Sequence, residues 1–335
     1  MKSILAKVSA LAVASGMMMS PQAQAGTNTL CVFDILGTQG SVFSMMQDYK
    51  LQAAKWGDTL VLKPYTDERI AAEDFKAGQC DGVVLTGLRA RQFDSFTGSI
   101  DSVGAVVSYD QLREAIAYLA KPSMAKYMMK NGFEVAGISP MGAAYLFVND
   151  RSINNVSKLA GKRIGVLDYD KAQAKLVQQV GAQPVASDIT NFAGKFNNGS
   201  VDVVAAPAVA FKPLELYKGL GTRGAIPNFP LAQLTVQIVI RPNKFPADFG
   251  QKSREYVASH FDSSLVLIKR AEAGIDPKYW MELPAADKEK YIAMLRQSRI
   301  ALTKDGIYDK QSMHFLKVLR CHDNPSAAEC AENLE

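Results

Sequence analysis

The hydrophobic pattern between residues 159 and 207 predicts three strands that alternate with two helices. These elements follow one another at 164–167, 171–180, 182–187, 191–196 and 200–207. The three strands are short apolar runs, whereas Ala174, Val177 and Val180 recur at the spacing of a helix. Strands and helices that alternate in this way predict a parallel α/β sheet.

Ligands of such sheets bind beyond the carboxyl ends of the strands. In this segment the ends lie near 167–170, 185–188 and 205–208, so we expect any binding site there. Asp168 and Asp170 follow the first strand. Carboxylates in that position more often cap the next helix than form a catalytic pair.

The chain before this segment alternates in the same way. Strands are predicted at 31–36, 60–65, 82–86 and 135–138, and helices at 42–55, 67–77, 109–119 and 123–131. Two further apolar segments, Met141–Asn149 and Leu234–Arg241, are predicted to cross between two halves of the molecule, and Pro242 closes the second. The sequence therefore predicts two α/β lobes, 26–145 and 146–241, joined by two crossings.

Residues 242–335 are predicted to be mainly helical. The helices are expected at 248–270, 287–299 and 310–320. The three histidines of the chain, His260, His314 and His322, all lie here, and a solvated or packed role is expected for each. We expect this segment to return to the first lobe.

The first 25 residues have the pattern of a signal peptide. Lys2 and Lys7 precede the apolar stretch Val8–Met19, and Ala23–Ala25 forms a small-residue cleavage motif. The apolar stretch is too short for a membrane span, which needs about 20 residues. We therefore expect export to the periplasm, with cleavage after Ala25.

The four cysteines indicate disulfides, because an even number in an exported chain is typical of paired cysteines. Three pairings are possible. Cys31 and Cys80 begin the first and third predicted strands, which are neighbours in a doubly wound lobe, and Cys321 and Cys330 are close in the chain. We favour the pairs 31–80 and 321–330. No metal site is expected, because the chain has no C-x-x-C motif.

Several short motifs carry a family resemblance. The segment Asn149–Asn155 leads into Leu159–Ile164, followed by Gly181–Val185 and by Asn198–Asp202, which runs on to Pro207. This order and spacing resembles the second domain of the periplasmic solute-binding proteins of tripartite ATP-independent (TRAP) transporters. The order of elements in the first predicted lobe fits that family as well.

The resemblance implies a two-lobe periplasmic binding protein fold (type II-like), α/β in class, with parallel-dominated sheets, helices on both faces and a hinge cleft. It also implies that the helical segment 242–335 spans the lobes. The implied function is capture of a small molecule and its delivery to membrane permease subunits, without a cofactor and without catalysis. We expect a monomer.

The cleft is expected to be lined by strand ends and loops of both lobes. The predicted ligand-binding residues are Thr38, Gln39, Thr86, Arg89, Tyr145, Arg163, Gly165, Asp168, Ala206 and Phe211.

The chain departs from the family where organic acids are bound. The family's carboxylate-binding arginine falls on Gly165, a second frequent arginine falls on Tyr145, and polar contacts are replaced by Ala205 and Ala206. A buried carboxylate without a cationic partner would cost several kcal/mol. Either the ligand is not a simple carboxylate, or an arginine elsewhere, Arg163 or Arg89, has taken over the role. We favour an uncharged or mixed polar–aromatic ligand.

The composition and the missing motifs argue against several other classes of function. The formal net charge is +5, without long basic runs, so nucleic-acid binding is not expected. The chain has no G-x-G-x-x-G, P-loop, G-x-S-x-G or H-E-x-x-H motif, so an enzyme is not expected. Two alternatives remain: a periplasmic sensor or interaction protein that partners a membrane receptor or efflux component, and a periplasmic enzyme on the same scaffold.

Overall fold

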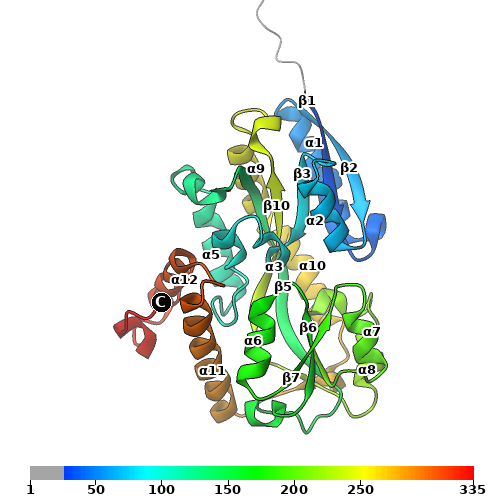
Figure 1. The fold of residues 1–335 in the computed structure, drawn as a ribbon, viewed down its shortest axis with the longest axis vertical. Coiled ribbons are helices and arrows are strands. Elements are labelled where there is room, and N and C mark those ends of the chain that lie inside the picture. Colours follow the sequence, from blue (N-terminus) through cyan, green and yellow to red (C-terminus); the bar gives the residue numbers. More distant parts are fainter. Residues whose placement is uncertain (1–25) are drawn as a thin grey trace, which may run out of the picture.

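The computed structural model describes residues 26–335, and most of its strands belong to one nine-stranded sheet (Figure 1). The strand order is β2-β1-β3-β10-β5-β8-β6-β7, with β4 paired to β5 beside this path. The strands are β1 (Gly26–Phe33), β2 (Asp58–Tyr65), β3 (Gly82–Thr86), β4 (Met129–Lys130), β5 (Phe133–Val148), β6 (Arg163–Leu167), β7 (Gln183–Ser187), β8 (Val203–Pro207) and β10 (Ala232–Ile240). A separate parallel pair is formed by β9 (Ile226–Pro227) and β11 (Trp280–Met281).

Two long strands connect the two lobes. In the first lobe β1 pairs in parallel with β2 and β3, and in the second lobe β6 pairs in parallel with β7 and β8. Antiparallel β5 and β10 lie between these groups, with β10 paired to β3 and β5 paired to β8. The chain therefore crosses between the lobes twice, as the sequence predicts.

A bulge interrupts β5 between the lobes. The register with β10 shifts between Leu234 and Thr235, opposite Met141 and Gly142. Gly142 has φ 114°, a backbone conformation that a side chain would strain, so glycine is required there. The predicted strand 135–138 and the predicted crossing 141–149 are thus one bulged strand.

Helices cover both faces of each lobe (Figure 1). The first lobe carries α1 (Ser41–Lys55), α2 (Glu68–Lys76), α3 (Gly87–Ala90), α4 (Ser95–Gly98), α5 (Tyr109–Leu119) and α9 (Phe249–Ser259), and the second carries α6 (Lys171–Gln179), α7 (Phe192–Asn197) and α8 (Leu216–Leu220). The remaining helices are α10 (Phe261–Ala273), α11 (Ala285–Lys304) and α12 (Lys310–Asp323). Short 3-10 turns lie at Gly37–Gln39, Pro122–Met128, Val156–Leu159, Ala208–Ala210, Pro242–Lys244, Pro277–Tyr279 and Ala328–Ala331.

Alternate side chains of strand β1 pack into two different hydrophobic clusters of the first lobe. Leu30 and Val32 pack in the cluster formed with α1 and α9, whereas Cys31 and Phe33 pack in the cluster formed with α2 and α5. Successive side chains of a strand point to opposite faces, so one apolar run serves both layers.

Two predicted helices are wrong in detail. The predicted helix 248–270 is two helices, because His260 leaves helical geometry (φ −97°, ψ 11°) and its N–H bonds to Val257 O, which closes α9. The predicted helix 123–131 is a 3-10 turn followed by β4. Asn131 and Gly132 both have positive φ and join β4 to β5 as a tight hairpin, the usual role of an Asn-Gly pair.

Both predicted disulfides are present. Cys31 of β1 is bonded to Cys80, just before β3, and Cys321 of α12 is bonded to Cys330. The first bond links residues 49 positions apart, and the second links residues 9 positions apart.

A buried ionic cluster fixes the C-terminal segment. Arg299 of α11 and Arg320 of α12 both pair with Glu329 and Glu335. Arg320 also donates a hydrogen bond to Ala105 O in the first lobe. The tail therefore packs back onto the first lobe.

None of the helices within residues 26–335 combines the length and the hydropathy of a membrane span. The predicted signal peptide, 1–25, lies outside the described residues, and so does its predicted cleavage position.

Candidate functional site

A cavity of about 510 Å³ lies between the two lobes, at the carboxyl ends of β1, β3, β6 and β8. Helices α1, α7, α9 and α10, strand β10 and the bulge of β5 also contribute to its walls. Most of the lining is apolar and includes Phe33, Leu36, Met45, Leu85, Leu88, Met141, Phe192, Val209, Leu214, Leu267 and Ile268. Small-molecule sites in proteins have this size, roughly 300–1,000 Å³, and are mostly apolar.

The polar groups of the lining carry little positive charge. Hydroxyl groups come from Ser41, Ser44, Tyr49, Thr86, Ser139, Tyr169, Tyr256, Ser263 and Ser264, a carboxamide comes from Gln173, and carboxylates come from Asp34 and Asp48. No Lys or Arg occurs among the described residues that line the cavity. Among the lining side chains of residues 26–335, only the imidazole of His260 belongs to a type that can carry a positive charge; it lies at the exposed junction of α9 and α10.

Asp34 occupies the N-terminus of α1. Its carboxylate accepts hydrogen bonds from the backbone N–H groups of Leu36 (2.9 Å), Val42 (2.8 Å) and Phe43 (3.2 Å). Gly40 leaves the space for it, since a Cβ there would lie 1.8 Å from Asp34 Oδ1. The first free N–H groups of the helix, which attract anions, are thus satisfied by the chain itself.

Beside the cavity, a buried carboxylate of the first lobe meets a tyrosine of the second. Glu68 of α2 is fully buried and accepts hydrogen bonds from Thr86 N (2.6 Å) and Tyr169 Oη (3.1 Å). Arg89 Nε lies 3.6 Å from Glu68 Oε2, and its guanidinium covers the Tyr169 ring at 3.3 Å from the centroid. The stacking is a cation–π contact between the lobes.

A second ion pair also joins the lobes. Arg91 Nη1 lies 3.1 Å from Asp170 Oδ1, and Arg91 Nε donates to Gly98 O. Asp170 also accepts from Ala172 N and so caps α6, as expected for a carboxylate after a strand. We call Glu68, Arg89, Arg91, Tyr169 and Asp170 the interlobe polar cluster.

Burial shifts the titration of the carboxyls in this region. Desolvation raises the pKa of Glu68, against the opposing effect of its hydrogen bonds and of Arg89. Desolvation also raises the pKa of Asp101 to about 7, although Thr235 donates to both of its oxygens. Burial raises the pKa of Tyr169 as well, so its hydroxyl stays a hydrogen-bond donor.

Three of the ten predicted ligand-binding residues line the cavity, namely Thr86, Gly165 and Ala206. Each lies in a strand of the sheet, where the parallel topology places ligand sites. Thr38 and Gln39 lie in an exposed 3-10 turn after β1, and they do not line the cavity although their neighbours Leu36 and Ser41 do.

Tyr145 and Phe211 lie in the core of the second lobe instead of the cavity. Tyr145 follows Ala144, which lines the cavity, so its side chain points to the other face of β5. There its hydroxyl donates to Glu272 Oε1 (3.1 Å) and its ring packs edge-on against Trp280. Phe211 stacks with Phe147.

The remaining charged predictions also fall outside the cavity. Arg89 is buried in the interlobe polar cluster. Arg163 begins β6, at the end of the strand opposite the cavity, and forms an exposed ion pair with Asp202 (2.8 Å). Asp168 is exposed just beyond β6. The idea that Arg163 grips a ligand carboxylate therefore does not fit the structure.

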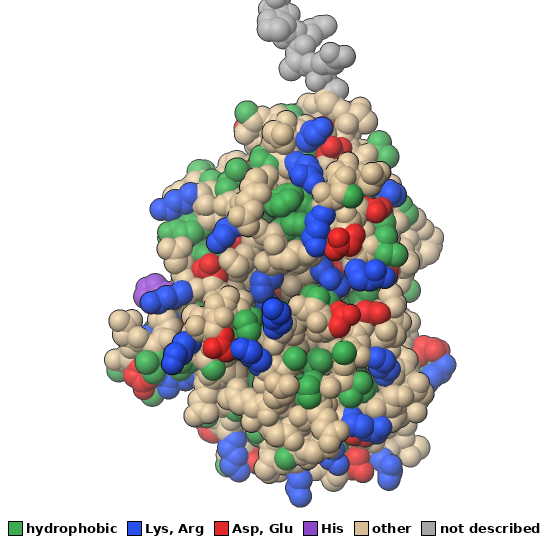
Figure 2. Space-filling view, in the orientation of Figure 1, with side chains coloured by type: hydrophobic (Ala, Val, Ile, Leu, Met, Phe, Trp, Pro, Cys, Tyr) green, Lys and Arg blue, Asp and Glu red, His purple; other side chains and the backbone are tan. Residues whose placement is uncertain are grey.

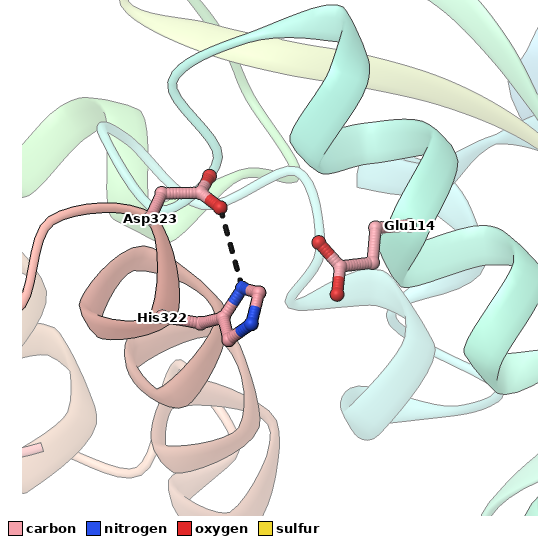
Figure 3. A group of neighbouring side chains, drawn as sticks. All are labelled: Glu114, His322 and Asp323. Carbon is pink, nitrogen blue, oxygen red and sulfur yellow. Dashed lines mark ion pairs between the residues drawn. The ribbon is translucent and has the colours of Figure 1, made fainter.

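One further group of potential ligands lies on the surface. Glu114 of α5 and His322 and Asp323 of α12 face one another (Figure 3), and one ligand atom of each lies within 4.8 Å of the others. All three residues are exposed, and Asp323 already accepts a hydrogen bond from Gln111 Nε2 (2.7 Å). The group lies on the outside of α5 and α12 and belongs to neither the cavity nor the interlobe polar cluster.

The whole fold has close structural counterparts. A TRAP periplasmic solute-binding protein from Desulfovibrio desulfuricans, with bound sn-glycerol-3-phosphate, superposes with a TM-score of 0.72 at 14% identity, over 92% of this chain and 100% of that one. One from Haemophilus influenzae with bound L-gulonate gives a TM-score of 0.70 at 12% identity, over 88% and 99% of the two chains. The predicted α/β fold with two lobes is confirmed.

Sequence comparison gives closer relatives. The probable solute-binding protein AdeT1 of Acinetobacter baumannii is 52% identical over 304 residues, which are 91% of this chain and 100% of that protein. Residues 53–335 match the family described as solute-binding protein AdeT 1/2. The chain therefore belongs to the AdeT 1/2 family of solute-binding proteins and has the fold of the TRAP periplasmic solute-binding proteins.

Proposed function

We propose that the protein captures a small molecule in the cavity between its lobes and delivers it to the permease subunits of a membrane transporter. The cavity itself is the observation that carries the proposal. It lies at the strand ends of both lobes, has the volume of a small-molecule site and is bounded by the bulge of β5.

The related structures support this reading by analogy. The two TRAP periplasmic solute-binding proteins hold sn-glycerol-3-phosphate and L-gulonate. Because proteins of this fold bind small solutes, the same use of the fold is the simplest account of the cavity here.

The two lobes move as units in this proposal. They comprise residues 26–145 with the returning segment 242–335, and residues 146–241. The bulge at Met141–Gly142 and the facing residues of β10 act as the hinge, since a bulge breaks the regular ladder and lets the strands bend. The interlobe polar cluster forms when the lobes close.

The protein works in the periplasm as a monomer in this proposal, after cleavage behind Ala25, and it binds without turnover. Its surface suits a soluble carrier: Lys and Arg are interspersed with Asp and Glu over the face seen in Figure 2. Mixed charge of this kind does not favour nucleic-acid binding.

Native mass spectrometry of the gently purified mature protein tests the proposal. We expect one small molecule per chain, and small-angle scattering should show a smaller radius of gyration with the solute than after its removal. A chain that carries and accepts no solute, or one that binds solute without any change in shape, would contradict capture by hinge closure. Co-purification with permease subunits, rather than with a receptor, would favour transport over sensing.

A further inference from the structure

We propose, on the basis of the function proposed above, that the cavity takes an uncharged and largely apolar solute, because the chain fills each of its own anion-binding positions at the cleft with one of its own carboxylates. Three such positions lie at the cavity or behind its wall: the N-terminus of α1, Arg89 and Arg91. The carboxylates that fill them are Asp34, Glu68 and Asp170.

The N-terminus of α1 opens toward the cavity, since Asp34, Ser41 and Val42 all line it. Free N–H groups there would suit a carboxylate or phosphate of a ligand. Asp34 accepts from two of them, Val42 N and Phe43 N, at 2.8 and 3.2 Å. A ligand anion at this position would meet a negative charge instead of free donors.

Arg89 is closed off by an ion-pair contact and an aromatic ring, without a hydrogen bond from its Nε. Glu68 is fully buried next to it, and the Tyr169 ring, which lines the cavity, lies over the guanidinium. The aromatic ring therefore lies between Arg89 and the cavity. Glu68 takes the place that an acidic ligand would otherwise have beside this cation.

Arg91 makes the third pair. Its guanidinium contacts Asp170 at 3.1 Å and Gly98 O at 3.1 Å, and both partners are supplied by the chain. Within the part of the chain that the structure describes, the lining itself holds no guanidinium or ammonium group. An anion entering the cavity would be desolvated near Asp34 and Asp48 without a cationic partner, whereas an apolar solute would gain from the wall.

Two dyes with the same aromatic frame test this inference. N-phenyl-1-naphthylamine is neutral, and 1-anilinonaphthalene-8-sulfonate differs from it by one sulfonate. We expect the mature protein to bind the neutral dye at least ~10-fold more tightly than the sulfonate, because a tenfold ratio corresponds to the loss of about one good ion pair. Equal affinity, or tighter binding of the sulfonate, would overturn the inference.

A cavity-filling variant locates the dye. Ala205 lines the cavity and is exposed in the ligand-free protein, so Ala205→Trp should fold normally and fill the space. We expect this variant to bind the neutral dye at least ~10-fold more weakly, because the indole ring occupies the apolar space that the dye would fill. Undiminished binding would mean that the dye sits elsewhere, and the inference would fail.

Unmasking Arg89 gives a sharper test. In Glu68→Gln the cation loses its carboxylate while the side chain keeps its size, so the ratio of the two dissociation constants should fall toward 1. In the double variant Glu68→Gln/Arg89→Met, which has neither charge, the wild-type ratio should return. If Glu68→Gln leaves the ratio unchanged, Glu68 does not set the preference for the neutral dye. If this variant folds poorly, the ratio measured for the wild-type protein still decides the inference.

The failure of this inference is distinguishable from the failure of the proposed function. If native mass spectrometry finds a carboxylate or phosphate solute in the cavity, the apolar ligand class is wrong and solute capture stands. If the protein neither carries a solute nor binds either dye, solute capture fails with it.

Discussion

The wall of the cavity and the interlobe polar cluster lie side by side between the same two lobes, but they differ in almost every physical property. The wall is made of aliphatic, aromatic and methionine side chains; some of them, such as Leu36 and Leu267, are exposed, and others, such as Leu85, are buried. The cluster is made of charged and hydroxyl groups paired with one another; Glu68, Arg89 and Asp170 are buried, and Arg91 and Tyr169 are partly buried.

The difference separates two tasks that one set of residues could have shared. An arginine that holds an acidic ligand contributes both to affinity and to lobe closure. Here the charged residues make contacts across the lobes with each other, and the exposed apolar surface is left for the solute. Changes in the cluster should therefore act on stability and closure, and on binding only through closure, whereas changes in the wall should act on binding by direct contact.

The largest effect is expected from Glu68→Ala. It leaves Arg89 buried without a carboxylate, and a buried charge that loses its partner costs about 3–5 kcal/mol of unfolding free energy. Urea unfolding followed by circular dichroism measures this. The matched control is Arg163→Ala, which removes one member of an exposed pair with Asp202 and should cost less than ~1 kcal/mol. If the two variants lost equal amounts of unfolding free energy, the buried pair of Glu68 and Arg89 would contribute no more to stability than an exposed ion pair.

Asp101→Asn should remove the pH dependence of stability that arises from Asp101, which lies next to the interlobe polar cluster. Burial raises the pKa of Asp101 from 3.8 to about 7, so the folded protein holds this proton more tightly than the unfolded chain. The resulting stabilisation is present at low pH and is lost as pH rises through about 7. It amounts to ~4 kcal/mol when fully lost, by the linkage between pKa and stability.

An asparagine at position 101 cannot ionise, and it can keep both contacts with Thr235. The stability of the variant relative to the wild type should therefore rise between pH 5 and pH 8 in parallel unfolding titrations. A constant difference over this range would mean that Asp101 is ionised throughout.

Much of the fold could be predicted from the sequence, because buried parallel strands are short apolar runs bounded by turns. The predicted strand 82–86 coincides with β3, and the predicted strand 200–207 contains β8, which begins three residues later at Val203. The errors came from local geometry that hydrophobicity does not encode. The break at His260 lies inside a continuous helical pattern, whereas at 131–132 the Asn-Gly turn signal outweighs the helical pattern that precedes it.

The site was less predictable, because its geometry depends on parity and on distant partners. Tyr145 and Ala144 exchange faces with a shift of one residue, and the bulge at Gly142 introduces such a shift. Glu68 looks in the sequence like an ordinary acidic residue at a helix start. Only the folded chain brings Tyr169 to it, 101 positions later.

An intermediate effect is expected from Tyr169→Phe. It removes the hydroxyl that donates to Glu68 across the lobes and keeps the ring beneath Arg89, so closure should lose ~1.5–3 kcal/mol, the range for a hydrogen bond to a charged group. The neutral dye should bind more than tenfold more weakly. Tyr145→Phe is the control, because that hydroxyl bonds to Glu272, away from the cavity, and dye affinity should hardly change. If both variants reduced the affinity for the neutral dye equally, the hydrogen bond between the lobes would have no special role in closure.

The smallest effect on stability is expected in the wall. Leu267 of α10 lines the cavity and is 47% exposed, so Leu267→Ala removes little packing from the ligand-free protein. A bound apolar solute would cover this side chain, and losing part of that contact should cost ~1 kcal/mol of binding, or about fivefold in the dissociation constant of the neutral dye. Val266→Ala is the matched control, because Val266 is the preceding residue of the same helix, is 58% exposed and does not line the cavity. Isothermal dye titration and urea unfolding of both variants separate the two quantities. If Leu267→Ala changed stability and left the dye affinity unaltered, the wall would be part of the folding core, and the division of labour between wall and cluster would be wrong.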